Sequence, residues 1–169
     1  MARNPNNLRS IDASAPLDRI DLLLLAELQK NARVSNKELA ELAGLAPSTC
    51  LERLRRLRER RVLKGFHADV DLAQLGRPTQ AMISVRLRVH DRGQIDAFYQ
   101  HAIDMPESLA VFHVTGGDDY LIHAAVGDTA HLRTLVLDLT AREEVDHVET
   151  RLIFDFVRKT VVEPVEEGE

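Results

Sequence analysis

The N-terminal third of the chain alternates apolar and polar residues with the period of an α-helix. Three segments repeat in this way and each is predicted to form one helix; they are residues 17–30, 36–43 and 45–61. In the first segment, Asp18 is placed to cap the N-terminus, and four successive leucines predict burial on more than one side. The apolar face of this helix is expected to consist of Ile20, Leu24 and Leu28.

A tight turn separates the second helix from the third. Ser35 and Glu38 have the S-x-x-E spacing of a capping box, which satisfies two backbone donors at a helix N-terminus. Gly44 follows the second helix, where a left-handed residue is favoured, and the next helix begins at Pro47. Helix, Gly-containing turn and helix form the helix-turn-helix arrangement. The inward-facing residues of the second helix are expected to be Leu39 and Leu42.

The third helix has two stripes of different character. The stripe expected to face the core consists of Cys50, Leu54 and Leu57, and the polar stripe of Thr49, Arg53, Arg56 and Arg60. Small hydroxyl side chains at a helix N-terminus, followed by arginines, suit a helix that enters the major groove of DNA. We expect Ser48, Thr49 and Arg53 to read bases and Arg56 and Arg60 to hold phosphates. A solvated arginine face is the alternative, and the helix-turn-helix context favours DNA.

The periodicity changes after residue 78. Alternation from Thr79 to Val89 predicts a strand, and it is followed by helical, extended, extended, helical and extended patterns. Their order predicts a ferredoxin-like βαββαβ sandwich, so the fold class is α+β with an N-terminal three-helix helix-turn-helix domain. These later patterns lie at about residues 95–102, 109–115, 120–126, 132–139 and 145–162.

Composition divides the chain into five parts. Residues 1–16 are expected to be a flexible arm, in which Arg3 and Arg9 could touch DNA although an uninvolved tail is favoured. The three-helix domain covers 17–64, a turn-rich linker 65–77, the sandwich 78–162 and an acidic tail 163–169.

Both faces of the predicted hairpin strands are apolar. Tyr120, Ile122, Ala124 and Val126 alternate with Leu121 and Ala125, and strand 109–115 shows the same property. Two helices can cover only one face of a sheet, so the other face needs an apolar cover. A second copy of the sheet is the economical cover, and this predicts an obligate homodimer with its sheets face to face.

Charge is distributed unevenly along the chain. The net charge is −5, yet residues 1–65 contain 13 Lys and Arg against 8 Asp and Glu, whereas the rest contains 9 against 19. A basic N-terminal part suggests a polyanion partner, and the acidic C-terminal part suggests a different task. No apolar run is long enough to span a bilayer, and the first 16 residues lack the apolar segment of a signal peptide. With the single Cys50, this predicts a cytoplasmic protein.

Enzyme chemistry is not indicated by the residue patterns. No serine elbow, phosphate loop or cysteine nucleophile motif is present, and Cys50 is expected to behave as a small hydrophobe. The histidines show no tight metal-ligand spacing. A symmetric four-residue hairpin loop would pair His113 with Ile122 and His123 with Phe112, which sends the two imidazoles to opposite faces of the sheet. We therefore expect no metal site and no cofactor.

Two groups of motifs, in this order, resemble the Lrp/AsnC (feast/famine) regulators. The first comprises Leu17-Asp-Arg-Ile-Asp21, Asn36-x-Glu-Leu, Leu45-Ala-Pro-Ser-Thr-Cys-Leu-Glu-Arg-x-Arg-Arg-Leu57 and Gly65-Phe. The second, Val114-Thr-Gly-Gly-Asp-Asp-Tyr-Leu121, is similar to the hairpin motif of that family. The resemblance covers about residues 17 to 161.

The resemblance implies a bacterial or archaeal transcription regulator. Its helix-turn-helix would bind operator DNA, and its C-terminal RAM domain would mediate assembly and sense small molecules, typically amino acids. Dimers in this family commonly associate into octameric rings and hold the effector near the hairpin motif. The residues that would border the effector are Gly116, Gly117, Asp118, Asp119 and Tyr120, with Thr140 in the loop after the last helix as a further candidate.

The expected effector chemistry is simple. Two glycines expose backbone N–H groups that suit a carboxylate, and Asp119 could accept a charge-assisted hydrogen bond from an α-ammonium group. From the residues alone, a second interpretation stays open, in which these four positions only turn a hairpin. The alternative function is an amino-acid-binding or assembly module with little direct role on DNA, and the complete N-terminal helix-turn-helix speaks against it.

Overall fold

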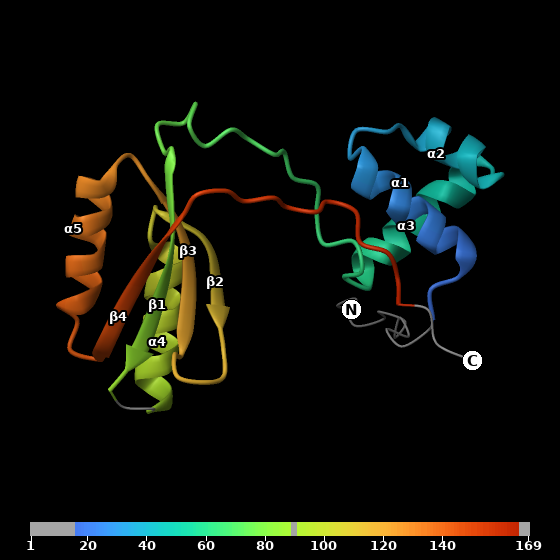
Figure 1. The fold of residues 1–169 in the computed structure, drawn as a ribbon. Coiled ribbons are helices and arrows are strands. Elements are labelled where there is room, and N and C mark those ends of the chain that lie inside the picture. Colours follow the sequence, from blue (N-terminus) through green and yellow to red (C-terminus); the bar gives the residue numbers. More distant parts are fainter. Residues whose placement is uncertain (1–15, 89–90, 166–169) are drawn as a thin grey trace, which may run out of the picture. The chain divides into compact units, whose positions relative to one another are not determined.

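The computed structural model describes residues 16–88 and 91–165, which form two compact units (Figure 1). The helical unit takes the chain up to Ala68 and again from Arg158 onward, and the sheet unit takes Asp69–Val157. Residues 1–15 of the expected arm 1–16, with Arg3 and Arg9, lie outside the described residues. No helix in the described part of the chain is long and apolar enough to cross a membrane.

The helical unit consists of the three predicted helices, α1 (Arg19–Lys30), α2 (Asn36–Ala43) and α3 (Pro47–Glu59). The predicted caps are confirmed: Asp18 and Ser35 each accept a hydrogen bond from the first turn of their helix and complete a capping box. Gly44 ends α2 in the left-handed conformation with φ +65°, as expected. The buried core that the three helices share consists of Leu24, Leu28, Leu39, Ala40 and Cys50.

Of two expectations about leucines in this unit, the one for Leu42 is wrong. Leu42 was expected to face inward but is 57% exposed, because Leu39, Ala40 and Ala43 form the packed face of the eight-residue α2. Helix α1 buries Leu24 and Leu28 on its core face, and Leu22 and Leu25, which lie away from that face, are half-buried. Burial therefore extends beyond the core face of α1, as the run of leucines predicted, and Leu23 alone of the four is exposed.

The sheet unit has the predicted order of elements. Its elements are β1 (Thr79–Leu87), α4 (Arg92–Asp104), β2 (Ser108–His113), β3 (Tyr120–Val126), α5 (Thr129–Thr140) and β4 (Val145–Ile153). The strands lie in the order β2-β3-β1-β4 and every neighbouring pair is antiparallel. This confirms the ferredoxin-like sandwich, with β1 and β3 as the central strands.

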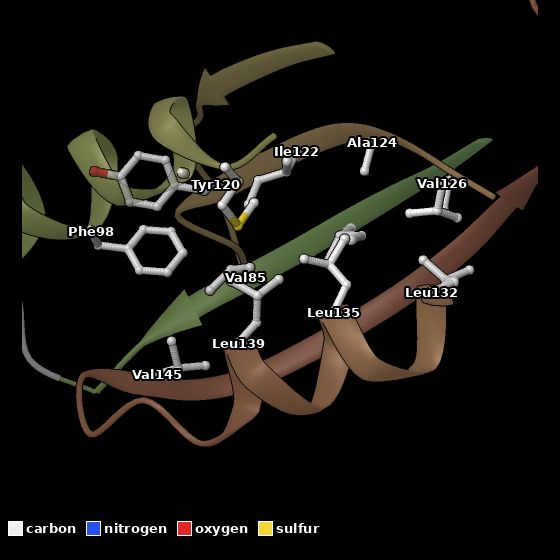
Figure 2. Packing of buried hydrophobic residues seen from close by; sticks show 14 of the residues in the cluster. Val85, Phe98, Tyr120, Ile122, Ala124, Val126, Leu132, Leu135, Leu139 and Val145 are labelled. Carbon is white, nitrogen blue, oxygen red and sulfur yellow. The ribbon is translucent and has the colours of Figure 1, made fainter. Parts of the chain in front are cut away.

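One face of the sheet forms the core of this unit. Alternate residues of β1 and β3 point toward α4 and α5, and Figure 2 shows Leu132, Leu135 and Leu139 of α5 directed at this face. The fully buried strand residues on the covered face include Ile83, Val85, Tyr120, Ile122, Ala124 and Val126. These buried positions follow the period of two expected of strands.

The opposite face of the sheet is also largely apolar. Phe112 of β2 lies on it with 49% exposure, and Met82 and Leu121 lie on it half-buried. Part of this face is covered by the chain itself, because Phe156 lies edge-on against His123 with ring centroids 5.0 Å apart.

The last strand is shorter than predicted. It ends at Ile153 instead of running to Val162, and residues from Arg158 onward belong to the helical unit. The Gln29 side chain of α1 donates a hydrogen bond to the Val162 carbonyl (3.2 Å) and accepts one from the Val162 N–H (2.8 Å). The side-chain amide of Gln29 thus satisfies both backbone groups of Val162 outside the sheet.

Candidate functional site

The N-terminal turn of α3 is exposed and held in place by α2. Pro47 occupies the first helical position, and its carbonyl accepts a hydrogen bond from Nδ2 of Asn36 at the start of α2 (2.9 Å). Ser48 and Thr49 follow on the surface, where the sequence predicts base-reading residues. Of the helices in the described ranges, α3 begins without a capping side chain, at Ala46.

Arg53 faces α1. Its Nη1 donates to Oδ2 of Asp18 (2.6 Å) and to Oδ1 of Asp21 (2.8 Å). Only 23% of the Arg53 side chain and 12% of the Asp21 side chain are exposed. The expectation that Arg53 reads bases therefore meets a competing structural role, which sequence spacing gave no reason to consider.

Electrostatics around Asp18 favour its charged form. The backbone N–H of Asp21 and the guanidinium of Arg53 both donate to this carboxylate, and together they hold the pKa of Asp18 below its ordinary value of 3.8. The same carboxylate caps α1 and pairs with α3.

A second arginine on α3 is held within the helix. Arg55 Nη2 and Nε donate to Glu52 (2.6 and 3.0 Å), and its Nη1 donates to Glu59. Both carboxylates raise the pKa of Arg55 and hold its charge on the helix surface. The i,i+3 and i,i+4 spacings were visible in the sequence, although the expected stripe did not include them.

The remaining arginines of the expected stripe lie together. Arg53, Arg56 and Arg60 line one small depression beside Asp21, so the stripe runs along the α1 side of α3. Arg56 is exposed, whereas Arg60 is half-buried at the C-cap of the helix. Burial raises the pKa of the Cys50 thiol on the neighbouring core-facing stripe, as expected of a residue that acts as a small hydrophobe.

The glycine-rich hairpin loop of the sheet unit is open. Gly116 has φ +127°, and at both Gly116 and Gly117 an added Cβ would have no neighbour within 4 Å. Next in the loop, Asp119 is tied to the end of β1: its N–H donates to the Val85 carbonyl (2.9 Å), and its Oδ2 accepts from the Leu87 N–H (2.7 Å). One carboxylate oxygen of Asp119 is therefore already engaged, and Asp118 is half-buried beside it.

Tyr120 and Thr140 lie in settings that differ from the expected ones. Tyr120 is 1% exposed, its ring stacks on His113 at 4.9 Å, and its hydroxyl donates to the Ile95 carbonyl (3.2 Å). Burial raises the pKa of its phenol. Thr140 is the last residue of α5 and not part of the following loop, and its hydroxyl donates to the Val136 carbonyl (2.7 Å). Both hydroxyls are thus hydrogen-bonded inside the unit.

The two histidines of the hairpin lie on opposite faces, as predicted. The pairing differs in detail: His113 lies opposite Tyr120, and His123 opposite Ala110, because six residues and not four connect the paired ends. His123 Nε2 lies 3.0 Å from Oε1 of Gln80, and burial lowers the pKa of this imidazole. Within residues 16–88 and 91–165, no group of three or more His, Cys, Asp and Glu side chains could hold a metal ion.

Comparison with known proteins finds two family models that match successive parts of the chain. Residues 17–58 match the AsnC-type helix-turn-helix domain, and residues 80–163 match the Lrp/AsnC ligand binding domain. Among curated relatives, the regulator AldR of Mycolicibacterium smegmatis is 42% identical over 156 residues, covering 92% of this chain and 89% of AldR. The leucine-responsive regulatory protein of Rhizobium meliloti is 34% identical, covering 80% of this chain and 88% of the relative.

A solved structure shows the same arrangement of elements. A transcriptional regulator of Neisseria meningitidis, crystallised as a complex with L-Met, matches with a TM-score of 0.81 and 30% identity. The match covers 89% of this chain and 98% of the Neisseria chain.

The charge of Asp18 predicts how the stability of the helical unit depends on pH. Because the folded-state pKa is below the ordinary value, the stabilisation is complete above about pH 4 and is lost as pH falls through the folded-state pKa. Replacement Asp18→Asn keeps a capping acceptor and removes the charge. Urea unfolding followed by circular dichroism should show wild type more stable than Asp18→Asn at pH 6, with the difference shrinking below pH 4. A constant difference from pH 6 to pH 2.5 would contradict this assignment.

Proposed function

The chain belongs to the Lrp/AsnC family of transcriptional regulators, and we propose that it binds operator DNA through α3 under the control of an amino acid or related small metabolite. The family comprises regulators with a helix-turn-helix DNA-binding domain and a ligand-binding domain, so the chain is a regulator and not an enzyme. Its expected targets are genes of amino-acid metabolism.

The exposed N-terminal turn of α3 carries this proposal. Ser48 and Thr49 lie on the surface of the helix that follows the left-handed turn at Gly44, and Arg56 lies exposed two turns further on. Short hydroxyl side chains at this position reach base edges, and arginines later along the helix reach phosphates. We assign base reading to Ser48 and Thr49, and phosphate contacts to Arg56 and Arg60. In a dimer, the two copies of α3 would enter successive major grooves, about one helical turn apart.

Arg56→Ala should weaken DNA binding by a similar factor for every sequence. Each lost phosphate contact reduces the slope of log K against log[salt] by about 0.9. Fluorescence anisotropy with fragments of the protein's own upstream region measures both quantities. Arg55→Ala is the matched control, since Glu52 and Glu59 already hold that guanidinium and its loss should change the slope less.

The same titrations test the whole proposal. Ser48→Ala and Thr49→Ala should lower the ratio of operator to non-specific affinity while leaving the salt slope unchanged. If wild type binds no upstream fragment at all, the amino-acid-binding or assembly module becomes the better description of this protein.

We further propose that the chain forms a homodimer through the sheet face opposite α4 and α5, and that dimers assemble into an octamer. Phe112 supports this because a half-exposed phenylalanine opposite Leu121, on the face that also carries Met82, gives that face an apolar surface suited to a second copy. Octameric assembly is carried over from the resemblance to the family.

Phe112→Asp should dissociate the dimer at micromolar concentration, because the apolar contact would then bury an unpaired carboxylate. Leu137→Asp is the matched control: Leu137 is similarly exposed, at 56%, but lies on α5. Light scattering distinguishes monomer, dimer and octamer. A monodisperse wild-type monomer would refute the dimer.

The effector is proposed to bind at the glycine-rich loop. The open space around Gly116 and Gly117 leaves backbone N–H groups accessible to a carboxylate, and Asp118 and Asp119 supply negative charge for an ammonium group. Tyr120 and Thr140 would lie at the border of this site. Their hydroxyls already donate to backbone carbonyls, so we propose no hydrogen bond from them to the effector. An amino acid is supported by the L-Met complex of the Neisseria regulator and by the leucine-responsive relatives.

A thermal-shift screen against the twenty amino acids should find one or more that raise the melting temperature. A ligand at 100 times its Kd adds about 2.7 kcal/mol to the free energy of unfolding. Gly117→Val should abolish the shift while leaving the unliganded melting temperature nearly unchanged, since a Cβ at Gly117 meets no atom within 4 Å. An undiminished shift in Gly117→Val would place the effector elsewhere. Asp119→Ala should also abolish the response and leave DNA affinity largely intact.

A further inference from the structure

The pairing of Arg53 with α1 involves two carboxylates from one helical turn. The same Nη1 atom donates to Asp18 at 2.6 Å and to Asp21 at 2.8 Å, across 35 and 32 positions of sequence. Charge-assisted hydrogen bonds of this length are among the strongest polar contacts in proteins. We refer to Asp18, Asp21 and Arg53 as the α1–α3 cluster.

The cluster is built into the capping box of α1. Oδ1 of Asp18 accepts the Asp21 N–H at 2.8 Å while Oδ2 accepts from Arg53, and Oδ2 of Asp21 lies 3.5 Å from the Asp18 N–H. The two carboxylates that start α1 are therefore the two that hold α3. A change in the direction of α3 would have to break a hydrogen bond of the first turn of α1 or an ion pair.

The remaining contacts between these helices are less directional. Leu24 and Leu28 of α1 meet Cys50 of α3 in the core, and apolar contacts of this kind are proportional to buried area with little dependence on angle. The cluster adds the directional contact. Arg56 and Arg60 line the same depression as Arg53, so the direction that the cluster sets is shared by the residues proposed to meet phosphates.

Direct DNA contact by Arg53 would be costly. It would require the guanidinium to leave Asp21, whose side chain is only 12% exposed, and a nearly buried carboxylate without its partner is strongly unfavourable. If Arg53 stayed in place, the two carboxylates would neutralise its charge and repel a phosphate.

We propose that Arg53 is a positioning residue, which together with Asp18 and Asp21 fixes the direction of α3 on α1 and acts on DNA only through that direction. This inference rests on the proposed DNA-binding function. It assigns the same role to an arginine and to two aspartates. Loss of an aspartate should therefore affect DNA affinity in the same direction as loss of the arginine, which is the opposite of what the charges alone would predict. Removal of a negative charge near DNA ordinarily strengthens binding, whereas removal of Asp21 should weaken it.

The experiment compares full-length wild type, Arg53→Ala, Asp21→Ala and the double variant in operator binding, salt dependence and urea unfolding. We expect both single variants to bind the operator roughly tenfold more weakly, and the double variant to be scarcely weaker than either, as coupled residues are. The salt slope should stay at the wild-type value in all four proteins, because Arg53 itself makes no phosphate contact and Arg56 and Arg60 still meet their phosphates in the bound complex. Arg53→Lys should recover part of the affinity, since an ammonium group restores the charge without the planar fork.

The opposite results identify Arg53 as a DNA contact. In that case Asp21→Ala binds the operator as tightly as wild type or more tightly. Arg53→Ala alone then either lowers the ratio of operator to non-specific affinity or reduces the slope of log K against log[salt] by about 0.9. Should either alanine variant fail to fold, Arg53→Lys and Asp21→Asn answer the same question with smaller perturbations.

Hydrogen exchange separates this inference from the proposed function. The α3 amides of unbound Arg53→Ala and Asp21→Ala should both exchange faster than those of wild type, which requires no DNA. If wild type binds no DNA but this exchange is faster, the proposed function fails while the orienting role of the cluster holds. Unchanged exchange in both variants overturns the inference, whatever wild type does with DNA.

Discussion

Backbone pairing along β1 is the interaction on which the sheet unit depends. This strand pairs with β3 on one side and β4 on the other, and alternate residues from Ala81 to Leu87 are buried against α4 and α5. The end of β1 also holds the glycine-rich loop through Val85 and Leu87. Scaffold and candidate effector site are therefore one hydrogen-bonded structure, in which the loop takes its position from the strand that forms the core.

Much of this could be predicted from the sequence because the signals are local. Periodicity identified the helices and strands of residues 16–88 and 91–165, and capping residues located the starts of α1 and α2 because a cap acts within one turn. The hairpin connection has six residues where four were expected. Because side chains alternate between faces with a period of two, this even difference changed the cross-strand partners of His113 and His123 but left each on its predicted face.

The failures concern contacts between distant parts of the chain. Leu42 has the apolar character of a core residue, but Leu39 and Ala40 form the buried face of α2 and Leu42 is exposed. Residues after Ile153 are as β-prone as those before it. Their place in the helical unit depends on a contact with a distant residue, the hydrogen bond from the Val162 N–H to the Gln29 side chain. Arg53 belongs to a basic stripe by spacing, yet its partners are found more than 30 positions away. The charge that α3 presents to a polyanion is thus smaller than a count of its arginines suggests, because carboxylates hold Arg53 and Arg55.

The return of the C-terminal segment to α1 has a mechanical consequence. In the order of the chain, the sheet unit is an insertion: the polypeptide leaves the helical unit after Ala68, forms the sheet, and rejoins the helical unit at Arg158. The sheet unit is therefore joined to the helical unit by two backbone segments and not by one linker, and the second segment leads to the Gln29–Val162 hydrogen bonds.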